Sequence, residues 1–187
     1  MVRRICRIAA AVLLVVVGLA VYRRVSLLGG SGMTLPPPED RALFIDFTLP
    51  DVQGNLVRLL DLRGRPVLIN LWATWCYPCR VEMPSMNALY KDFQAKGLAI
   101  LAIAIDAGGK PAVAPFLQAY RLTFSVLLDP QNMLGTQLQV PGIPASYLLD
   151  TRGRLVDYKF GRHDWDTPAI RHLVDQLLAE DGGGTAP

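Results

Sequence analysis

Two apolar runs of strand length, at residues 65–72 and 98–106, constrain the fold of this chain most strongly. The first reads RPVLINLW and the second LAILAIAID. Neither alternates apolar with polar residues, which is typical of strands buried on both faces of a parallel sheet. Between them, apolar residues recur at helical spacing from Cys76 to about Lys96, and Gly97 follows as a helix stop. The pattern therefore predicts a strand–helix–strand unit around a parallel sheet.

The rest of the folded part extends this unit with a hairpin at each end. Residues 47–64 predict two short strands around a turn at 53–55. The later elements are expected as a helix over about 111–120, strands over 124–129, 144–150 and 154–160, and a last helix opened by Thr167 and Pro168. We therefore expect an α/β fold, a three-layer sandwich whose mixed central sheet follows an N-terminal strand hairpin.

The first 25 residues have a different character. An uncharged, almost wholly apolar run spans 8–22, with three arginines before it and two after it. We interpret it as an uncleaved membrane anchor, while residues 18–20 leave a cleaved signal peptide as the alternative. Fifteen residues rise only about 22 Å as a helix, and the flanking arginine stems offset part of the shortfall against the bilayer core. The excess of positive charge before the run predicts an N-in orientation.

Composition separates this segment from the rest. It carries five of the 19 basic residues and none of the 16 acidic ones, so the remainder has 14 basic and 16 acidic residues, a formal net charge of −2. No nucleic-acid partner is expected. The predicted organisation is an anchor or signal segment at 1–25, a Gly/Ser/Pro tether at 26–38, a folded domain at 39–180 and a disordered tail at 181–187.

Cys76 and Cys79 form a Cys-Tyr-Pro-Cys motif where the first buried strand ends and the helix begins. Open α/β sheets place their sites at this carboxyl edge. The first N–H groups and the dipole of the helix favour a thiolate at Cys76. Cys79 lies one turn further on, within reach for a disulfide and facing further into the protein. The motif therefore predicts that Cys76 attacks a partner disulfide and Cys79 resolves the mixed disulfide, with Pro78 fixing the first turn.

Three other interpretations of the cysteine pair are weaker. A structural zinc site needs four ligands, and the remaining candidates, His163 and His172, are nine residues apart and remote in sequence. A purely structural disulfide would close so small a loop that it adds little stability. A lone cysteine nucleophile would need a histidine in a catalytic motif, which neither histidine provides. Redox chemistry without a metal or cofactor is the primary prediction.

VLINLWATWCYPCRVEMP (67–84), followed by VPGIPASYLLDTRGRLV (140–156), resembles the thioredoxin superfamily. Within it, the chain is similar to the membrane-anchored TlpA/ResA/DsbE-type thiol-disulfide oxidoreductases over roughly residues 42–180. The Trp-Cys-x-Pro-Cys run together with a downstream Gly-x-Pro before a strand carries this resemblance. It implies a thioredoxin-like three-layer sandwich with a redox-active disulfide between Cys76 and Cys79.

The resemblance also implies residues that contact a substrate. Pro144 matches the cis-proline beside the disulfide, and the backbone around Ile143 is expected to pair with a substrate segment as an added strand. Trp75 matches a tryptophan that flanks the reactive thiol, with simple packing as the alternative. Tyr77, between the two cysteines, is a further candidate for substrate contact.

The proton chemistry of the site departs from ordinary thioredoxins. Asn70 stands where they carry a buried aspartate, so that carboxylate is absent. Glu82 matches an acidic residue of the TlpA/ResA-like branch and is expected to accept the proton of Cys79, with a solvated helix charge as the alternative. Ala145 stands where the family often has threonine. The segment 161–165 resembles TlpA-like chains and is assigned no chemistry, which leaves His163 as a surface or packing residue.

The predicted setting is the bacterial inner membrane, with the domain in the oxidising periplasm or extracytoplasmic space, where a tethered thioredoxin is most useful as a reductant. The resemblance implies electrons from a DsbD/CcdA-like membrane thiol transporter and substrates such as apocytochrome c or copper chaperones of respiratory oxidases. A thiol oxidase or isomerase is the alternative within the same chemistry. A redox-inactive thioredoxin-fold binding module and a peroxidase are the alternatives from other classes.

Overall fold

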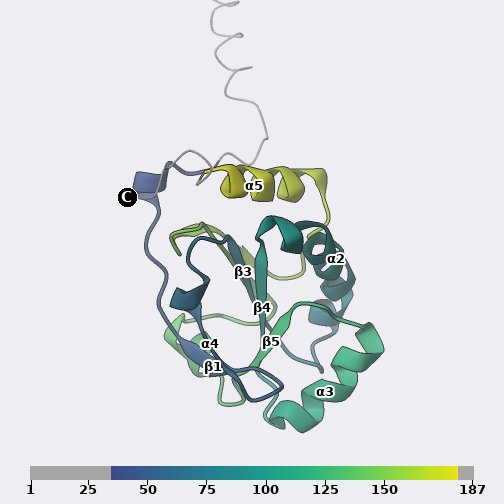
Figure 1. Cartoon of the computed structure of the whole chain (residues 1–187). Coiled ribbons are helices and arrows are strands. Elements are labelled where there is room, and N and C mark those ends of the chain that lie inside the picture. Colours follow the sequence, from purple (N-terminus) through teal and green to yellow (C-terminus); the bar gives the residue numbers. More distant parts are fainter. Residues whose placement is uncertain (1–34, 181–187) are drawn as a thin grey trace, which may run out of the picture. The chain divides into compact units, whose positions relative to one another are not determined.

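The computed structural model describes residues 35–180, which form a five-stranded mixed sheet with helices on both faces (Figure 1). The strand order is β5-β4-β3-β6-β7, and β3 pairs in parallel with β4 and antiparallel with β6. The strands are β3 (Val67–Trp72), β4 (Ala99–Ala104), β5 (Ser125–Leu128), β6 (Ala145–Leu149) and β7 (Leu155–Phe160). Both apolar runs are therefore central strands, and every residue of β3 and β4 is buried.

A separate hairpin and a set of helices complete the fold. The hairpin consists of β1 (Thr48–Pro50) and β2 (Leu56–Arg58). The α-helices are α2 (Tyr77–Phe93), α3 (Gly109–Tyr120), α4 (Met133–Gln137) and α5 (Pro168–Ala179). Short 3-10 turns are η1 (Pro38–Asp40), η2 (Leu59–Leu62) and η3 (Gln94–Lys96). This architecture confirms the predicted α/β sandwich with its leading hairpin.

Two details differ from the predicted elements. Helix α3 begins at Gly109 rather than near Pro111. Helix α4 was not predicted, because five residues are too few to show a helical period. The carboxylate of Asp129 starts α4 by accepting hydrogen bonds from the Met133 and Leu134 N–H groups at 3.0 and 2.9 Å. This helix leads into the loop before β6, which borders the candidate site.

Side chains of β3 alternate between the two faces of the sheet. Val67, Ile69 and Leu71 pack into a core that the leading hairpin and α4 cover. On the opposite face, Trp72 packs on Phe116 of α3 with ring centroids 4.9 Å apart, and α2 and α5 cover the rest of that face through their buried residues. Asn70 also faces this second layer. It places a polar amide among buried apolar side chains, so the amide needs hydrogen-bond partners there.

An ion cluster joins the two ends of the described chain at the end of the sheet remote from the cysteines. The buried Arg41 guanidinium contacts the Asp150 carboxylate at 3.1 Å and the Glu180 carboxylate at 2.6 Å. Asp150 follows β6 directly, and Leu149 at the end of β6 pairs with Val67 at the start of β3. The cluster therefore fastens the segment before β1 to the turn after β6 and to the end of α5.

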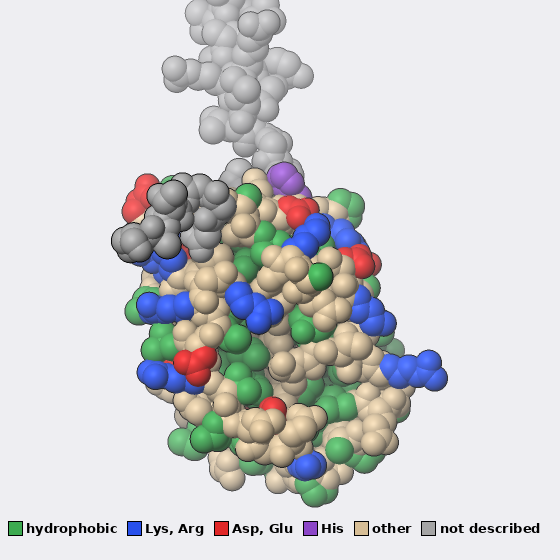
Figure 2. Space-filling view, in the orientation of Figure 1, with side chains coloured by type: hydrophobic (Ala, Val, Ile, Leu, Met, Phe, Trp, Pro, Cys, Tyr) green, Lys and Arg blue, Asp and Glu red, His purple; other side chains and the backbone are tan. Residues whose placement is uncertain are grey.

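The predicted anchor or signal segment and the tail lie outside the described residues, as does most of the tether. Residues 36 and 38, in the part of the predicted tether that the structure describes, contact the domain, since the carbonyls of Pro36 and Pro38 accept hydrogen bonds from Arg41 and Arg154. Within residues 35–180, no helix has the length and apolar character to cross a membrane. On the face shown in Figure 2, lysine and arginine side chains are scattered among apolar and neutral groups rather than gathered in one patch.

Candidate active site

The two cysteines lie at the junction between β3 and α2, and they form a disulfide with Cα atoms 5.3 Å apart. Cys76 is the N-cap residue of α2, and its Sγ accepts a hydrogen bond from the Cys79 N–H at 3.3 Å. Pro78 occupies the first turn, where its missing N–H has no helical partner to lose. A Cys76 thiolate formed on reduction would therefore face the unpaired N–H groups and the positive end of the helix dipole.

The two sulfurs differ in access. Cys76 is 5% exposed, and Cys79, in the first turn of α2, is fully buried. Cys76 is thus the cysteine nearer to a partner, and Cys79 is the one held inside the protein. This is the order that the motif predicts for an attacking and a resolving thiol.

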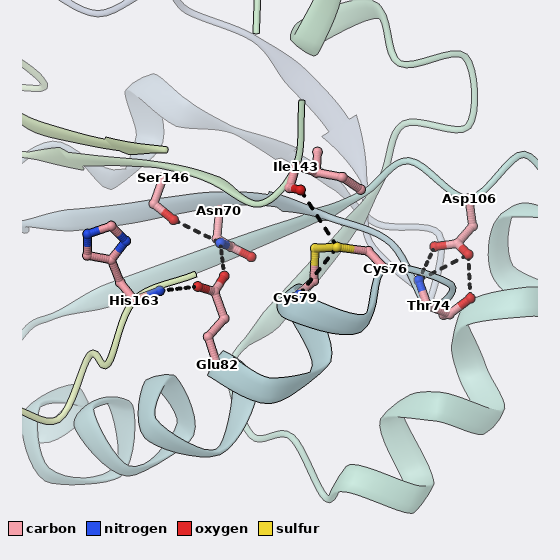
Figure 3. Close-up of a disulfide and its surroundings, with 9 residues drawn as sticks. All are labelled: Asn70, Thr74, Cys76, Cys79, Glu82, Asp106, Ile143, Ser146 and His163. Atoms are coloured by element: carbon pink, nitrogen blue, oxygen red, sulfur yellow. Dashed lines mark hydrogen bonds between the residues drawn. A yellow bond between two sulfur atoms is a disulfide. The ribbon is translucent and has the colours of Figure 1, made fainter. Parts of the chain in front are cut away.

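The loop before β6 brings Ile143 and Pro144 against the disulfide. The Ile143–Pro144 peptide bond is cis, and the Ile143 carbonyl oxygen lies 3.8 Å from the Sγ of Cys76 (Figure 3). The carbonyl of Pro144 accepts a hydrogen bond of 2.9 Å from the N–H of Gly161, just after β7. Residues 67 positions apart in the sequence thus meet beside the disulfide.

The aromatic residues beside the reactive cysteine are directed outward. Trp75 is 67% exposed and Tyr77 is 72% exposed. Packing does not account for Trp75, because most of its indole surface faces solvent. An exposed aromatic pair next to the less buried of the two cysteines is suited to contact with another protein chain.

Glu82 lies one turn beyond Cys79 on α2 and is only 1% exposed, so it is not a solvated helix charge. Its Oε1 accepts a hydrogen bond from the Asn70 amide at 2.8 Å, and its Oε2 accepts one from the backbone N–H of His163 at 3.0 Å (Figure 3). Burial raises the pKa of the Glu82 carboxyl above its ordinary value of 4.5, and these hydrogen bonds act in the opposite direction. A carboxyl in this state can exchange a proton closer to neutral pH than a surface glutamate can.

The segment 161–165, to which sequence analysis assigned no chemistry, connects these parts of the site. Besides the contacts of Gly161 and His163, the N–H of Trp165 donates to the Ser85 Oγ at 3.1 Å. The His163 ring is half-buried, with its Nδ1 3.0 Å from the Gly161 carbonyl, so the side chain does pack as predicted. The hydrogen bond to Glu82 comes from the backbone N–H of His163 and not from its ring. The residue type at position 163 therefore does not reveal it.

Besides the predicted Glu82, a second buried carboxylate lies near the cysteines, that of Asp106, and sequence analysis missed it. It follows β4 and accepts hydrogen bonds from the backbone N–H and the hydroxyl of Thr74, in the turn that leads to Cys76 (Figure 3). A detectable signal existed, since an aspartate two residues after the end of β4, which is parallel to β3, falls on the same sheet edge as the cysteines. Asp106 fixes the turn that presents Trp75 and Cys76.

Among residues 35–180, no group of three or more His, Cys, Asp or Glu side chains is arranged to hold a metal ion. Both cysteines of the motif are engaged in the disulfide instead. Within the described part of the chain, the chemistry available at this site is therefore that of a dithiol–disulfide pair with a buried carboxyl beside it.

Comparison with known proteins places this site in a family. The model of the AhpC/TSA family matches residues 41–158. The chain belongs to this family. It is 39% identical over 112 residues to the thiol-disulfide oxidoreductase ResA of Geobacillus thermodenitrificans, covering 59% of this chain and 63% of that protein. It is 38% identical over 118 residues to the thioredoxin-like protein YneN of Bacillus subtilis, covering 62% and 68%. The chain thus spans less than two thirds of the length of the first of these relatives.

Solved structures give the same result for the fold. A protein of Chlorobium tepidum, provisionally named as thiol:disulfide interchange protein DsbE, superposes with a TM-score of 0.64 at 31% identity, covering 74% of this chain and 94% of that one. The thioredoxin-like fold expected from the sequence is confirmed, and so is the resemblance to ResA- and DsbE-type proteins. Membrane anchoring stays a prediction.

Proposed function

We propose that this protein is a thiol-disulfide oxidoreductase that exchanges the Cys76–Cys79 pair with disulfides of other proteins. The position of the disulfide carries the proposal: it lies at the N-terminus of α2 and against the cis-proline loop, with the more accessible sulfur next to the Ile143 carbonyl. Relatives named thiol-disulfide oxidoreductase support the same activity.

The reaction needs only the two thiols and a partner disulfide. The Cys76 thiolate attacks one partner sulfur, the partner S–S bond breaks, and its other sulfur leaves as a thiolate that takes up a proton. Cys79 then attacks the Sγ of Cys76, which releases the second partner thiol and forms the Cys76–Cys79 disulfide. Two electrons pass from the protein dithiol to the partner in one cycle.

Glu82 is the proposed proton acceptor of the second step. Cys79 is fully buried and resists forming a thiolate by itself, because charge is disfavoured in an apolar surrounding. The Glu82 carboxyl is one turn away with a raised pKa, so its ionised form can take the thiol proton as Cys79 attacks. The substrate would bind as an extended segment along Ile143 and Pro144, with Trp75 and Tyr77 contacting its side chains.

The proposed direction is reduction, in the periplasm or extracytoplasmic space of a bacterium. The N-terminal run at 1–25 would anchor the protein in the inner membrane with its N-terminus inside. A DsbD/CcdA-like membrane transporter would supply electrons, and apocytochrome c or a copper-delivery protein of a respiratory oxidase would receive them. This part of the proposal is supported by the resemblance and by the basic, apolar N-terminal sequence.

The reduction potential of the full chain, equilibrated against a buffered thiol couple, tests the direction. A value near thioredoxin's, about −270 mV, is expected for a reductant. A value near that of the strong oxidant DsbA, about −120 mV, would overturn the reductase and make the protein a disulfide donor. Consumption of peroxide without a protein partner would point to a peroxidase, and a disulfide that does not respond to a dithiol would leave only a binding module.

A further inference from the structure

Asn70, in the middle of β3, has a fully buried amide with an uneven set of contacts. Its Nδ2 donates to the Glu82 Oε1 and to the Ser146 Oγ, both at 2.8 Å, so both N–H bonds are used. Its Oδ1 has no hydrogen-bond partner among the described residues. A buried acceptor without a donor costs free energy, and native proteins rarely leave one without a reason.

The orientation of this amide is fixed by its neighbours. In its ionised form the Glu82 carboxylate can only accept hydrogen bonds, so the nitrogen of Asn70 faces it, at 2.8 Å from Oε1. The oxygen then points to the other side, toward the disulfide and Cys79 (Figure 3). In the disulfide, the sulfur of Cys79 carries no hydrogen and has nothing to donate.

We propose that Asn70 is a positioning residue that accepts a hydrogen bond from the Cys79 thiol once the disulfide is reduced. Reduction by a dithiol breaks the Sγ–Sγ bond, and two electrons and two protons pass to the cysteines while the dithiol becomes its own disulfide. Cys79 keeps its proton because it is fully buried. Its S–H then has the unpaired Oδ1 of Asn70 as an acceptor.

This role deepens the proposed exchange reaction and rests on it. One amide would hold the proton donor, Cys79, through its oxygen and the proton acceptor, Glu82, through its nitrogen. The hydrogen bond to Cys79 exists only in the dithiol form, so Asn70 stabilises that form relative to the disulfide. Removing the amide should therefore make the protein harder to keep reduced.

The test is the equilibrium constant between disulfide and dithiol forms of the full chain in dithiothreitol buffers. Every variant carries Cys6→Ser, so that only the Cys76–Cys79 couple is counted. For Asn70→Leu, which has nearly the same volume and no polar atoms, we expect a shift of about fivefold toward the disulfide, the effect of one buried hydrogen bond. At 29.6 mV per tenfold for a two-electron couple, this is about 20 mV.

The matched control is Asn87→Leu, the same change at a buried asparagine of α2 whose amide contacts Thr123 and Arg121 instead of the cysteines. It should move the equilibrium less than twofold. If circular dichroism shows that Asn70→Leu does not fold, Asn70→Ala serves, because it also removes the amide. The expected shift is the same for either variant.

Repeating the comparison in a Glu82→Gln background distinguishes an effect through the Asn70 oxygen and Cys79 from one through the Asn70 nitrogen and Glu82. The shift should persist there, since the bond from Cys79 to Oδ1 does not involve the carboxylate. An unchanged equilibrium in the Asn70 variants, or a shift that disappears with Glu82→Gln, would overturn the inference. A wild-type disulfide that never equilibrates with dithiothreitol would instead overturn the proposed function.

Discussion

Two buried carboxylates at opposite ends of the central sheet have opposite surroundings. Asp150 has the Arg41 guanidinium at 3.1 Å and accepts backbone N–H groups of Arg152 and Arg154 at 2.9 and 2.8 Å. Glu82, beside the disulfide, accepts hydrogen bonds from two neutral donors, the Asn70 amide and the backbone N–H of His163. A cation pairs with the carboxylate at the first end, whereas at the second end burial raises the pKa of the Glu82 carboxyl. The fold thus keeps stability and chemistry at separate ends.

The largest expected effect is on stability, at the charged end. Arg41→Ala leaves the buried Asp150 without its cation and should lower the free energy of unfolding by about 3–5 kcal/mol. Chemical denaturation measures the loss, and disulfide exchange per folded molecule should be unchanged. Arg154→Met is the control, because Arg154 fastens the same segment through the neutral carbonyl of Pro38. A loss as large for the control would remove the special role of the ion pair.

At the other end, the largest effect should be kinetic. Glu82→Gln retains the shape of the side chain but cannot accept a proton, so resolution of the mixed disulfide should slow about 100-fold or more. Stopped-flow reaction of the reduced protein with an aromatic disulfide follows both thiol releases. The first release, which reports attack by Cys76, should keep its rate. Equal slowing of both phases would mean that Glu82 acts on Cys76 or on the fold as a whole.

The pH dependence of stability sharpens the same contrast. The folded-state pKa of Glu82 is raised above 4.5 by burial, so the folded state holds that proton more tightly than the unfolded chain does. The contribution of Glu82 to stability is therefore fully present below about pH 4.5 and is lost as pH rises through its folded pKa. In denaturation series from pH 4 to 8, Glu82→Gln should gain stability relative to wild type over this rise. Parallel curves would show that Glu82 does not titrate with a raised pKa.

The smallest expected effect compares the two ends of α5. Glu180 joins the ion cluster just after the helix, whereas at its start the Thr167 hydroxyl accepts a neutral hydrogen bond from the Ile170 N–H at 3.3 Å. Thr167→Ala should cost about 1 kcal/mol in the free energy of unfolding. Thr167→Ser, which keeps the hydroxyl, should cost little, and thermal or chemical denaturation distinguishes the two. If Thr167→Ala lowered the free energy of unfolding as much as Arg41→Ala does, the neutral cap and the ion pair would contribute equally, and this comparison would be wrong.

The sequence predicted well those features that depend on residue type at short range. Continuous apolar runs identified β3 and β4, and helical spacing identified α2. The helix predicted to about Lys96 ends as α2 at Phe93, and η3 continues it to Gly97, which adopts φ 120°. The resemblance supplied Pro144 and Glu82, which the structure brings near the cysteines. These signals lie within single elements or motifs, so a linear sequence can carry them.

The features that sequence analysis missed depend on contacts across the chain. The N–H of His163 on Glu82 would be offered by any residue except proline, so no letter in the sequence marks it. The partners of the ion cluster are separated by 109 and 139 positions. The unpaired Oδ1 of Asn70 becomes visible only when both of its N–H bonds have been assigned.

The ion cluster also determines which contacts would bear a force applied to the domain through the N-terminal part of the chain. The chain enters at Leu35 and leaves at Glu180 beside Arg41, at the end of the sheet opposite the disulfide. A pull on the chain ahead of Leu35 would strain the arginine's ion pairs and the end of α5 before it reached β3. A partner that binds at the disulfide and a force applied through the chain ahead of Leu35 would therefore act at opposite ends of the domain.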